Sequence, residues 1–505
     1  MRLELPTRIP LPKVFVYSAV FFCVQQLQHT GLYFSLLYFA FVILSVIAFN
    51  FAEGFTRITG AYIFWYSTLI VMVGVTWKAV LGEPADSNLF DPLLDMSLYT
   101  ASMVMLVIVT LLNRKVDFRA MGVGGGFSKG ELNYTAAGLG CVIVWFAILY
   151  SVPIFGNAPG GIVSALTQVN VFGPLGIILA TIGAIRDSGG RRSVNLISLI
   201  VYVFSAYLGV ISFSKQVMIL PMVCWMVGSF YARLRVRLVH VVAMICMAAL
   251  SFGFISPLSA SRDLAEGMDD AGHIQLVYYL ITHWSYFQAH VKELQDQEAL
   301  GHQEQGTAGY FDTPQGSLIQ RLTMLPPDDE LFTFSSHGHY EGMDPVYEYF
   351  TNLVPHFINP DKRGTFSGNW YAHEMGSGLA EDDYSTGISF SPVAEAYHCE
   401  GWGGIFWLLP LIWILLFSTI DFVVGDMTKY PWGLMVVVWF AHAAPEQLLG
   451  GMIYFIGYGN FGMILAIIVV TRIAPILGTL FLGKTIVPAG RRIRPARSIA
   501  AQMPG

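Results

Sequence analysis

Apolar runs of close to twenty residues recur along this chain of 505 residues. A helix rises about 1.5 Å per residue and the hydrocarbon core of a bilayer is about 30 Å thick, so one such run crosses it. Hydrophobic residues make up 54% of the chain and charged residues only 12%, too few to coat a soluble protein of this size. The sequence therefore predicts an all-α integral membrane protein with about twelve transmembrane helices, at residues 12–28, 31–51, 61–81, 92–112, 133–152, 163–184, 194–212, 216–232, 238–257, 402–421, 431–448 and 451–472.

The loops that are rich in lysine and arginine indicate the orientation of these helices. Basic residues cluster at 114–129, 186–192, 233–237 and 491–497, and all four clusters fall on the same side of the predicted bundle. Because short cytoplasmic loops carry an excess of positive charge, this side is expected to be cytoplasmic, with both termini inside. The first apolar run has no small-residue cleavage site after it, so it is expected to be a retained span.

Four regions follow from this topology. They are an N-terminal membrane domain with about nine spans (1–257), a mostly helical extracytoplasmic domain (258–401), C-terminal spans (402–483) and a basic cytoplasmic tail (484–505). The outer domain holds 22 of the 34 acidic residues but only 5 of the 28 basic ones. The chain has no basic domain of the kind that would suggest a nucleic-acid partner. Four of the five cysteines lie inside apolar runs, so no disulfide framework is expected.

The few cations on the outer face are candidate anion ligands. Lys215 follows the turn Ser-Phe-Ser between two predicted spans, against the positive-inside trend. Its side chain either anchors the helix at the membrane surface or binds a phosphate as a compact point charge. Arg321, Lys362 and Arg363 either pair with the many nearby carboxylates or converge with Lys215 on a pyrophosphate group, where a low dielectric strengthens the contact.

The return of the outer domain to the membrane, at residues 387–404, carries a second group of candidates. Glu395 and His398 are three residues apart and share one face of a helix, where they can act as a general base and its orienting partner for a sugar hydroxyl. The alternative is a helix end rich in acids, which we prefer for Glu400. In the eleventh predicted span, Glu446 follows Pro445 within an apolar run and has either a functional or a capping role.

Metal binding is not predicted by the sequence. Nine of the twelve histidines lie in the outer domain, yet none belongs to an HExxH motif or a comparable ligand spacing.

Three short motifs, in this order, give the chain a family resemblance. Ser-Phe-Ser-Lys at 212–215 precedes the outer domain, a Pro-x-x-x-x-Pro-Asp-Lys stretch at 355–362 lies within it, and Glu-Ala-Tyr-x-x-x-Gly-x-x-Gly at 395–404 ends it. The chain thereby resembles the Wzy-type polymerases of bacterial O-antigen and exopolysaccharide repeat units, which are related to the O-antigen ligases. It departs from the family pattern at His356, Ile358, Cys399 and Glu400.

The resemblance implies a glycosyltransferase of the membrane GT-C type in the bacterial inner membrane, with its large loop in the periplasm and no cofactor. Its substrates would be oligosaccharides on undecaprenyl pyrophosphate, and its partners a flippase and a chain-length regulator. It would assign Lys215, Arg321, Lys362 and Arg363 to the pyrophosphate, and Glu395 and His398 to the acceptor hydroxyl. A ligase that transfers the finished glycan remains an alternative. So does a transporter of a lipid-linked or charged solute, although the spans carry few polar residues besides His442 and Glu446.

Overall fold

The structure is a computed structural model, and it is helical throughout the residues that it describes. In that part of the chain, the only β pairing is an isolated bridge between Arg2 and Arg235. The described residues are 2–115, 132–155, 170–265, 267–304, 310–312, 317–320, 322–354, 358–359, 362, 364–377, 383 and 387–482. Two candidate cations, Arg321 and Arg363, lie outside them.

Among the described residues, seven helical segments are long and apolar enough to cross a membrane. They are α2 (Leu32–Phe51), α3 to α4 (Ile58–Leu81), α5 (Pro92–Asn113), the Tyr134–Ser151 part of α6 (Tyr134–Phe155), α11 to α12 (Leu238–Ser259), the segment ending in α20 (Gly404–Val424), and α22 to α24 (Leu449–Leu482). Shorter helices lie at five other predicted spans: α1 (Leu11–Leu27), α8 (Phe172–Asp187), α9 (Leu196–Ile211), α10 (Lys215–Tyr231) and α21 (Leu434–Glu446). The chain is therefore a helical membrane protein, as predicted, while the number of twelve spans stays a prediction.

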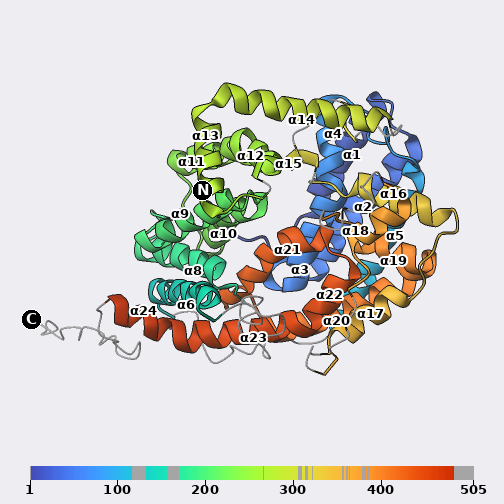
Figure 1. Cartoon of the computed structure of the whole chain (residues 1–505). Helices are drawn as coiled ribbons and strands as arrows, with labels where there is room; N and C mark the ends of the chain where they lie inside the picture. The colour runs from blue at the N-terminus through green and yellow to red at the C-terminus, as the bar shows by residue number, and fades with distance from the viewer. Residues whose placement is uncertain are drawn as a thin grey trace, which may run out of the picture.

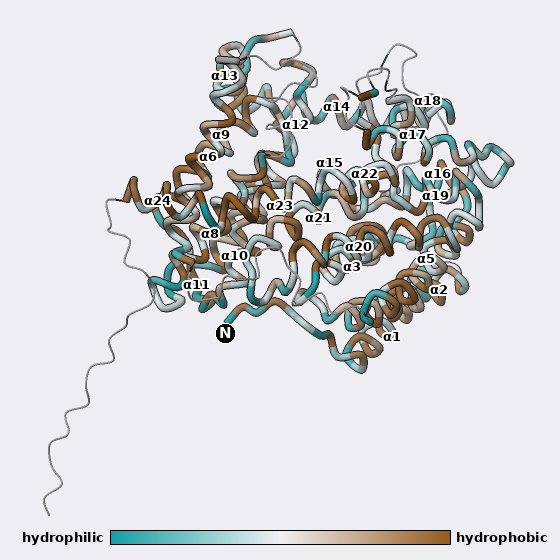
Figure 2. The backbone as a smooth tube through the Cα atoms, turned by 90° about the horizontal axis from the view of Figure 1, so that it is seen from below, coloured by the Kyte–Doolittle hydropathy of each residue, from teal (hydrophilic) through white to brown (hydrophobic). Residues whose placement is uncertain are grey.

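The predicted outer domain forms a set of shorter helices. These are α13 (Asp270–Thr282), α14 (Trp284–Glu304), α15 (Ser317–Gln320), α16 (Leu325–Ser336), α17 (Asp344–Asn352), α18 (Gly368–Met375) and α19 (Pro392–Glu400). In Figure 1, α14 runs across the top of the molecule from α13 towards α1 and α4. Helices α16 to α19 gather near α5 and α20. Figure 2 shows α16 and α18 to be more hydrophilic than α5, α20 and α23.

Two adjacent carboxylates of α16 attach the outer helices to the membrane helices. The Asp329 carboxylate accepts hydrogen bonds from the backbone N–H groups of Phe90 (2.6 Å) and Asp91 (3.0 Å) in the acidic loop between α4 and α5. The Tyr99 hydroxyl of α5 donates to Asp328 Oδ2 at 2.6 Å, and the Ser391 N–H donates to Oδ1 at 2.8 Å. The acidic loop and the helices of the predicted outer domain are therefore in direct contact.

Small residues let α24 (Ala474–Leu482) approach α6 closely. A Cβ atom on Gly140 would overlap the carbonyl oxygen of Ala474, and a Cβ atom on Gly478 would overlap that of Ala136. Each glycine is four residues from the alanine on its own helix, the small-xxx-small spacing by which membrane helices pack without side chains between them. This contact ties the last described helix to α6.

Candidate functional site

Helix α19 forms where sequence signals for a helix start and stop lie nine residues apart. The Ser391 hydroxyl caps the helix by accepting a hydrogen bond from the Ala394 N–H (3.2 Å), and Pro392 occupies the first turn. The chain leaves the helix at Gly401, which has a positive φ of 55°. All residues from Pro392 to Cys399 are buried, and only the last residue of the helix, Glu400, is exposed.

The carboxylate of Glu395 is held by three hydrogen bonds. Its side chain is fully buried, and its Oε1 accepts hydrogen bonds from the hydroxyls of Tyr349 (2.6 Å) and Tyr371 (2.7 Å). Its Oε2 accepts a short hydrogen bond from the backbone N–H of Leu449, the first residue of α22 (Leu449–Tyr454). An anion is favourable at a helix N-terminus, because the free N–H groups there carry partial positive charge. The carboxylate thus joins α17, α18, α19 and α22.

The environment of Glu395 makes it a group that can gain or lose a proton near neutral pH. Burial raises the pKa of Glu395 to about 7, although the hydrogen bonds from Tyr349, Tyr371 and Leu449 act in the opposite direction by stabilising the charged form. A carboxyl group with a pKa near the working pH is suited to general acid or base catalysis.

His398 is also fully buried, and its neighbours define its tautomer. Ser335 Oγ donates its single proton to the Leu331 carbonyl (2.6 Å), so the His398 Nδ1–H donates to Ser335 Oγ (2.9 Å). The Nε2 atom then carries a lone pair. It has no hydrogen-bond partner among the residues that the structure describes, and Glu374 Oε2 lies 3.4 Å away. Burial lowers the pKa of His398 to about 4, against the effect of the nearby His339 carbonyl, so the ring is neutral at physiological pH.

Ser335, His398 and Glu374 follow one another in the way of a hydrolase triad, but the geometry does not support that chemistry. Ser335 is fully buried and uses its proton within its own helix, so its oxygen is not a nucleophile awaiting a base.

The two predicted catalytic residues share α19 but make different contacts. Glu395 bonds to Tyr349, Tyr371 and Leu449, whereas His398 bonds to Ser335. Tyr371 contacts both: its hydroxyl donates to Glu395, and its ring lies edge-on to the imidazole at 5.2 Å. None of these four partners, Tyr349, Tyr371, Leu449 and Ser335, was predicted from the sequence. Their only sequence signal is that Tyr349 lies in an aromatic-rich helical stretch.

The structure separates the two described candidate cations. Lys362 Nζ donates to the Asn352 carbonyl at 2.7 Å, at the C-terminus of the helix that carries Tyr349. Lys215 begins α10 after the capping residue Ser214, next to a hydrophobic cluster that includes Phe213. Figures 1 and 2 place α10 and the group α17 to α19 in opposite halves of the molecule. The predicted convergence of these cations on one ligand remains a prediction.

Glu446 ends α21, with its carboxylate 3.2 Å from Nδ1 of His442 one turn earlier. Two residues then separate α21 from Leu449, whose N–H binds Glu395. Glu446, the predicted intramembrane carboxylate, therefore lies at the break between α21 and α22, three residues before the Leu449 N–H that binds Glu395.

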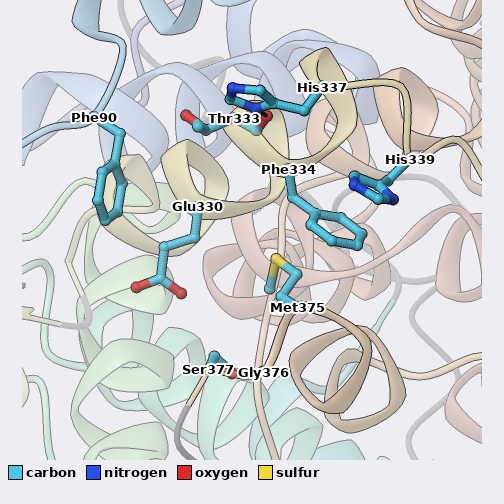
Figure 3. Close-up of a pocket in the computed structure, with 9 residues that line it drawn as sticks. All are labelled: Phe90, Glu330, Thr333, Phe334, His337, His339, Met375, Gly376 and Ser377. Carbon is cyan, nitrogen blue, oxygen red and sulfur yellow. Dashed lines mark hydrogen bonds between the residues drawn. The ribbon is translucent and has the colours of Figure 1, made fainter.

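A pocket of about 470 Å³ opens beside His398. Figure 3 shows its lining residues, which are Phe90, Glu330, Thr333, Phe334, His337, His339, Met375, Gly376 and Ser377. The Phe334 ring stacks on His339 at 4.4 Å and lies 6.1 Å from the His398 ring. The volume and the mixture of aromatic and polar groups are typical of small-ligand sites.

Comparison of the chain with protein-family models, with curated proteins and with solved structures finds no match in any of the three.

Proposed function

We propose that this protein polymerises oligosaccharide repeat units carried on undecaprenyl pyrophosphate, at the periplasmic face of the bacterial inner membrane. The observation that carries the proposal is Glu395, a fully buried carboxyl group with a pKa raised to about 7 where the outer helices meet the membrane helices. It belongs to the motif at 395–404 on which the family resemblance rests. The pocket lined by α16 and the end of α18 has room for part of a glycan.

In the proposed reaction, the acceptor hydroxyl oxygen forms a bond to the anomeric carbon of the donor glycan. The bond from that carbon to the pyrophosphate breaks, the pyrophosphate leaves with the electron pair, and Glu395 takes the hydroxyl proton. Pyrophosphate is already a good leaving group, so the protein has to position two substrates, neutralise the departing charge and remove one proton. Tyr349 is only partly buried, so its hydroxyl is the donor to Glu395 that an acceptor hydroxyl displaces.

The cations proposed for the pyrophosphate are Lys215, Arg321, Lys362 and Arg363. Of these, Lys362 is hydrogen-bonded to the last residue of the helix that carries Tyr349, whose hydroxyl donates to Glu395.

Deletion of the gene tests the proposal directly. We expect the mutant cells to accumulate single repeat units, and the wild-type gene to restore long chains, as a gel ladder of the glycans would show. The Arg321→Ala variant, compared in the same cells, tests that cation. Long lipid-linked chains that fail to reach their acceptor would identify a ligase instead. An unchanged ladder after deletion would contradict both readings and favour transport.

The pH dependence of polymerisation tests the role of Glu395 through Tyr349. As a base, Glu395 must be ionised, so the wild-type rate should rise with pH through about 7. Tyr349→Phe keeps the ring but removes a hydrogen bond to the carboxylate, which raises the pKa of Glu395. A hydrogen bond to a charged group contributes about 1.5–3 kcal/mol, so the pH at which the polymerisation rate rises should increase by about one to two units. Rates measured in membranes between pH 5 and 9 would show this, and an unshifted profile would exclude Glu395 as the titrating group.

A further inference from the structure

We propose that Glu341, Glu374 and His398 form a binding site for a divalent transition-metal ion. One ligand atom from each of these side chains lies within 4.8 Å of the other two. The distance between His398 Nε2 and Glu374 Oε2 is 3.4 Å. Neighbouring ligand atoms in a tetrahedral site with bonds of about 2.1 Å are also about 3.4 Å apart, so this pair is already spaced for a metal.

The strongest support is the unpartnered nitrogen of His398. The side chain is fully buried, and its Nε2 lies 3.4 Å from Glu374 Oε2 and has no hydrogen-bond partner among the described residues. A buried polar atom without a partner costs about 1–3 kcal/mol. Here three acceptors, one imidazole nitrogen and two carboxylates, lie within 4.8 Å of one another. A cation between them would satisfy all three.

The three ligands are held by the fold and do not meet by chance on a flexible surface. The backbone N–H of Glu341 donates to the carbonyl of His398 itself (3.0 Å), and the Gly342 N–H donates to that of Cys399 (3.1 Å). Gly342 has a φ of 76°, which lets the turn before α17 follow the end of α19. Ser335 fixes the orientation of the imidazole through its hydrogen bond with Nδ1, as the hydrogen-bond partners of metal-bound histidines do.

The local electrostatics also favour a cation. Glu374 is in the last turn of α18 and His398 in the last turn of α19, so the site lies at the C-termini of two helices. The free carbonyl groups there carry partial negative charge, which disfavours a carboxylate and favours a positive ion.

The donor set indicates the kind of metal. One imidazole nitrogen with two carboxylates suits Mn²⁺ or Zn²⁺, whereas Mg²⁺ and Ca²⁺ prefer oxygen ligands alone. Glu374 is 28% exposed, so one side of the site is open to solvent and to an entering ion. A metal site was not predicted from the sequence, because the chain has no HExxH motif or comparable ligand spacing, and these three ligands come from separate segments. The inference does not depend on the glycosyltransferase proposal.

Metal titration of the full-length protein in detergent tests the site. After treatment with EDTA, we expect the wild type to take up one Mn²⁺ per chain, followed as loss of the free-ion signal in electron paramagnetic resonance, and Zn²⁺ to compete for it. Glu374→Gln should weaken Mn²⁺ binding by at least about tenfold. Glu374 is partly exposed, so this variant is expected to fold. Glu400→Gln, at the exposed end of α19, is the matched control and should bind as the wild type does.

Thermal unfolding supplies an independent measurement. Added Mn²⁺ should raise the unfolding temperature of the wild type and of Glu400→Gln but not that of Glu374→Gln, because an ion that binds only the folded state stabilises it. His398→Gln should lose both responses. Absence of saturable Mn²⁺ and Zn²⁺ binding to the wild type would overturn the inference. So would equal binding to Glu374→Gln, which would place the ion elsewhere, or competition by Mg²⁺ at the same concentration as Zn²⁺, which would exclude the imidazole.

Discussion

Replacing Glu395 with glutamine is expected to lower the rate of glycan elongation by a factor of about 10²–10⁴, the usual contribution of a general base. Glutamine has nearly the same size but cannot accept the proton of the acceptor hydroxyl. Its amide oxygen can still accept from Tyr349 and Tyr371, while its NH₂ group faces the Leu449 N–H. The measurement is the length distribution and initial rate of lipid-linked glycan in membranes, normalised to the amount of protein.

The control for Glu395→Gln is Glu400→Gln, which removes an exposed carboxylate from the same helix. It should elongate glycans at the wild-type rate. The unfolding temperature of purified Glu395→Gln separates a chemical effect from misfolding. If a folded Glu395→Gln protein retained half of the wild-type rate, Glu395 would be a helix cap and not a base.

The second large effect is expected from Asp328→Ala, which should lower the free energy of unfolding by about 2–6 kcal/mol. The substitution leaves two buried donors, the Tyr99 hydroxyl and the Ser391 N–H, without an acceptor. Each unsatisfied group costs about 1–3 kcal/mol. Because Ser391 caps α19, the loss should also reduce activity. Thermal unfolding in detergent measures the effect, and Glu330→Ala, two residues along α16 on the wall of the pocket, is the control.

The stability that depends on Asp328 should also vary with pH. Burial raises the pKa of the folded Asp328 carboxyl to about 7, while the hydrogen bonds from Ser391 and Tyr99 lower it and the adjacent Asp329 raises it. The unfolded carboxyl titrates near pH 4. Between these values the folded state binds more protons, so this contribution falls as the pH rises from about 4 to 7 and is constant above that. Asp328→Ala should lack this component, and an identical pH profile for the two proteins would contradict the assignment.

The sequence predicted the membrane helices well because each is encoded locally by its apolar residues. The predicted spans 31–51 and 92–112 agree with α2 and α5 to within one residue at each end. The last predicted span, 451–472, is shorter than the helix at that place, which continues to Leu482. Arg472 lies within this helix, because a single charge does not interrupt the backbone hydrogen bonds of a helix.

The candidate site was predictable only in part. Glu395 and His398 could be placed on one helix from their spacing, but their partners lie on helices far away in the chain. Tyr349, Tyr371 and Glu374 reach α19 only through packing of α17 and α18 against it. No local pattern encodes such contacts. For the same reason, the proposed metal ligands Glu341, Glu374 and His398 have no signature in the sequence.

The helix from Leu449 to Leu482 has 34 residues and a single charge, Arg472. At about 1.5 Å per residue it is about 51 Å long, well beyond the hydrocarbon thickness of about 30 Å, so to remain within the apolar layer it must cross the bilayer obliquely. It touches α17, α19 and α20 near its start and α6 near its end, and Figure 1 shows it running beneath both halves of the molecule. On this side the helix contacts both halves of the molecule and joins them. Separating the two halves would therefore require this helix to bend or to detach from one of them.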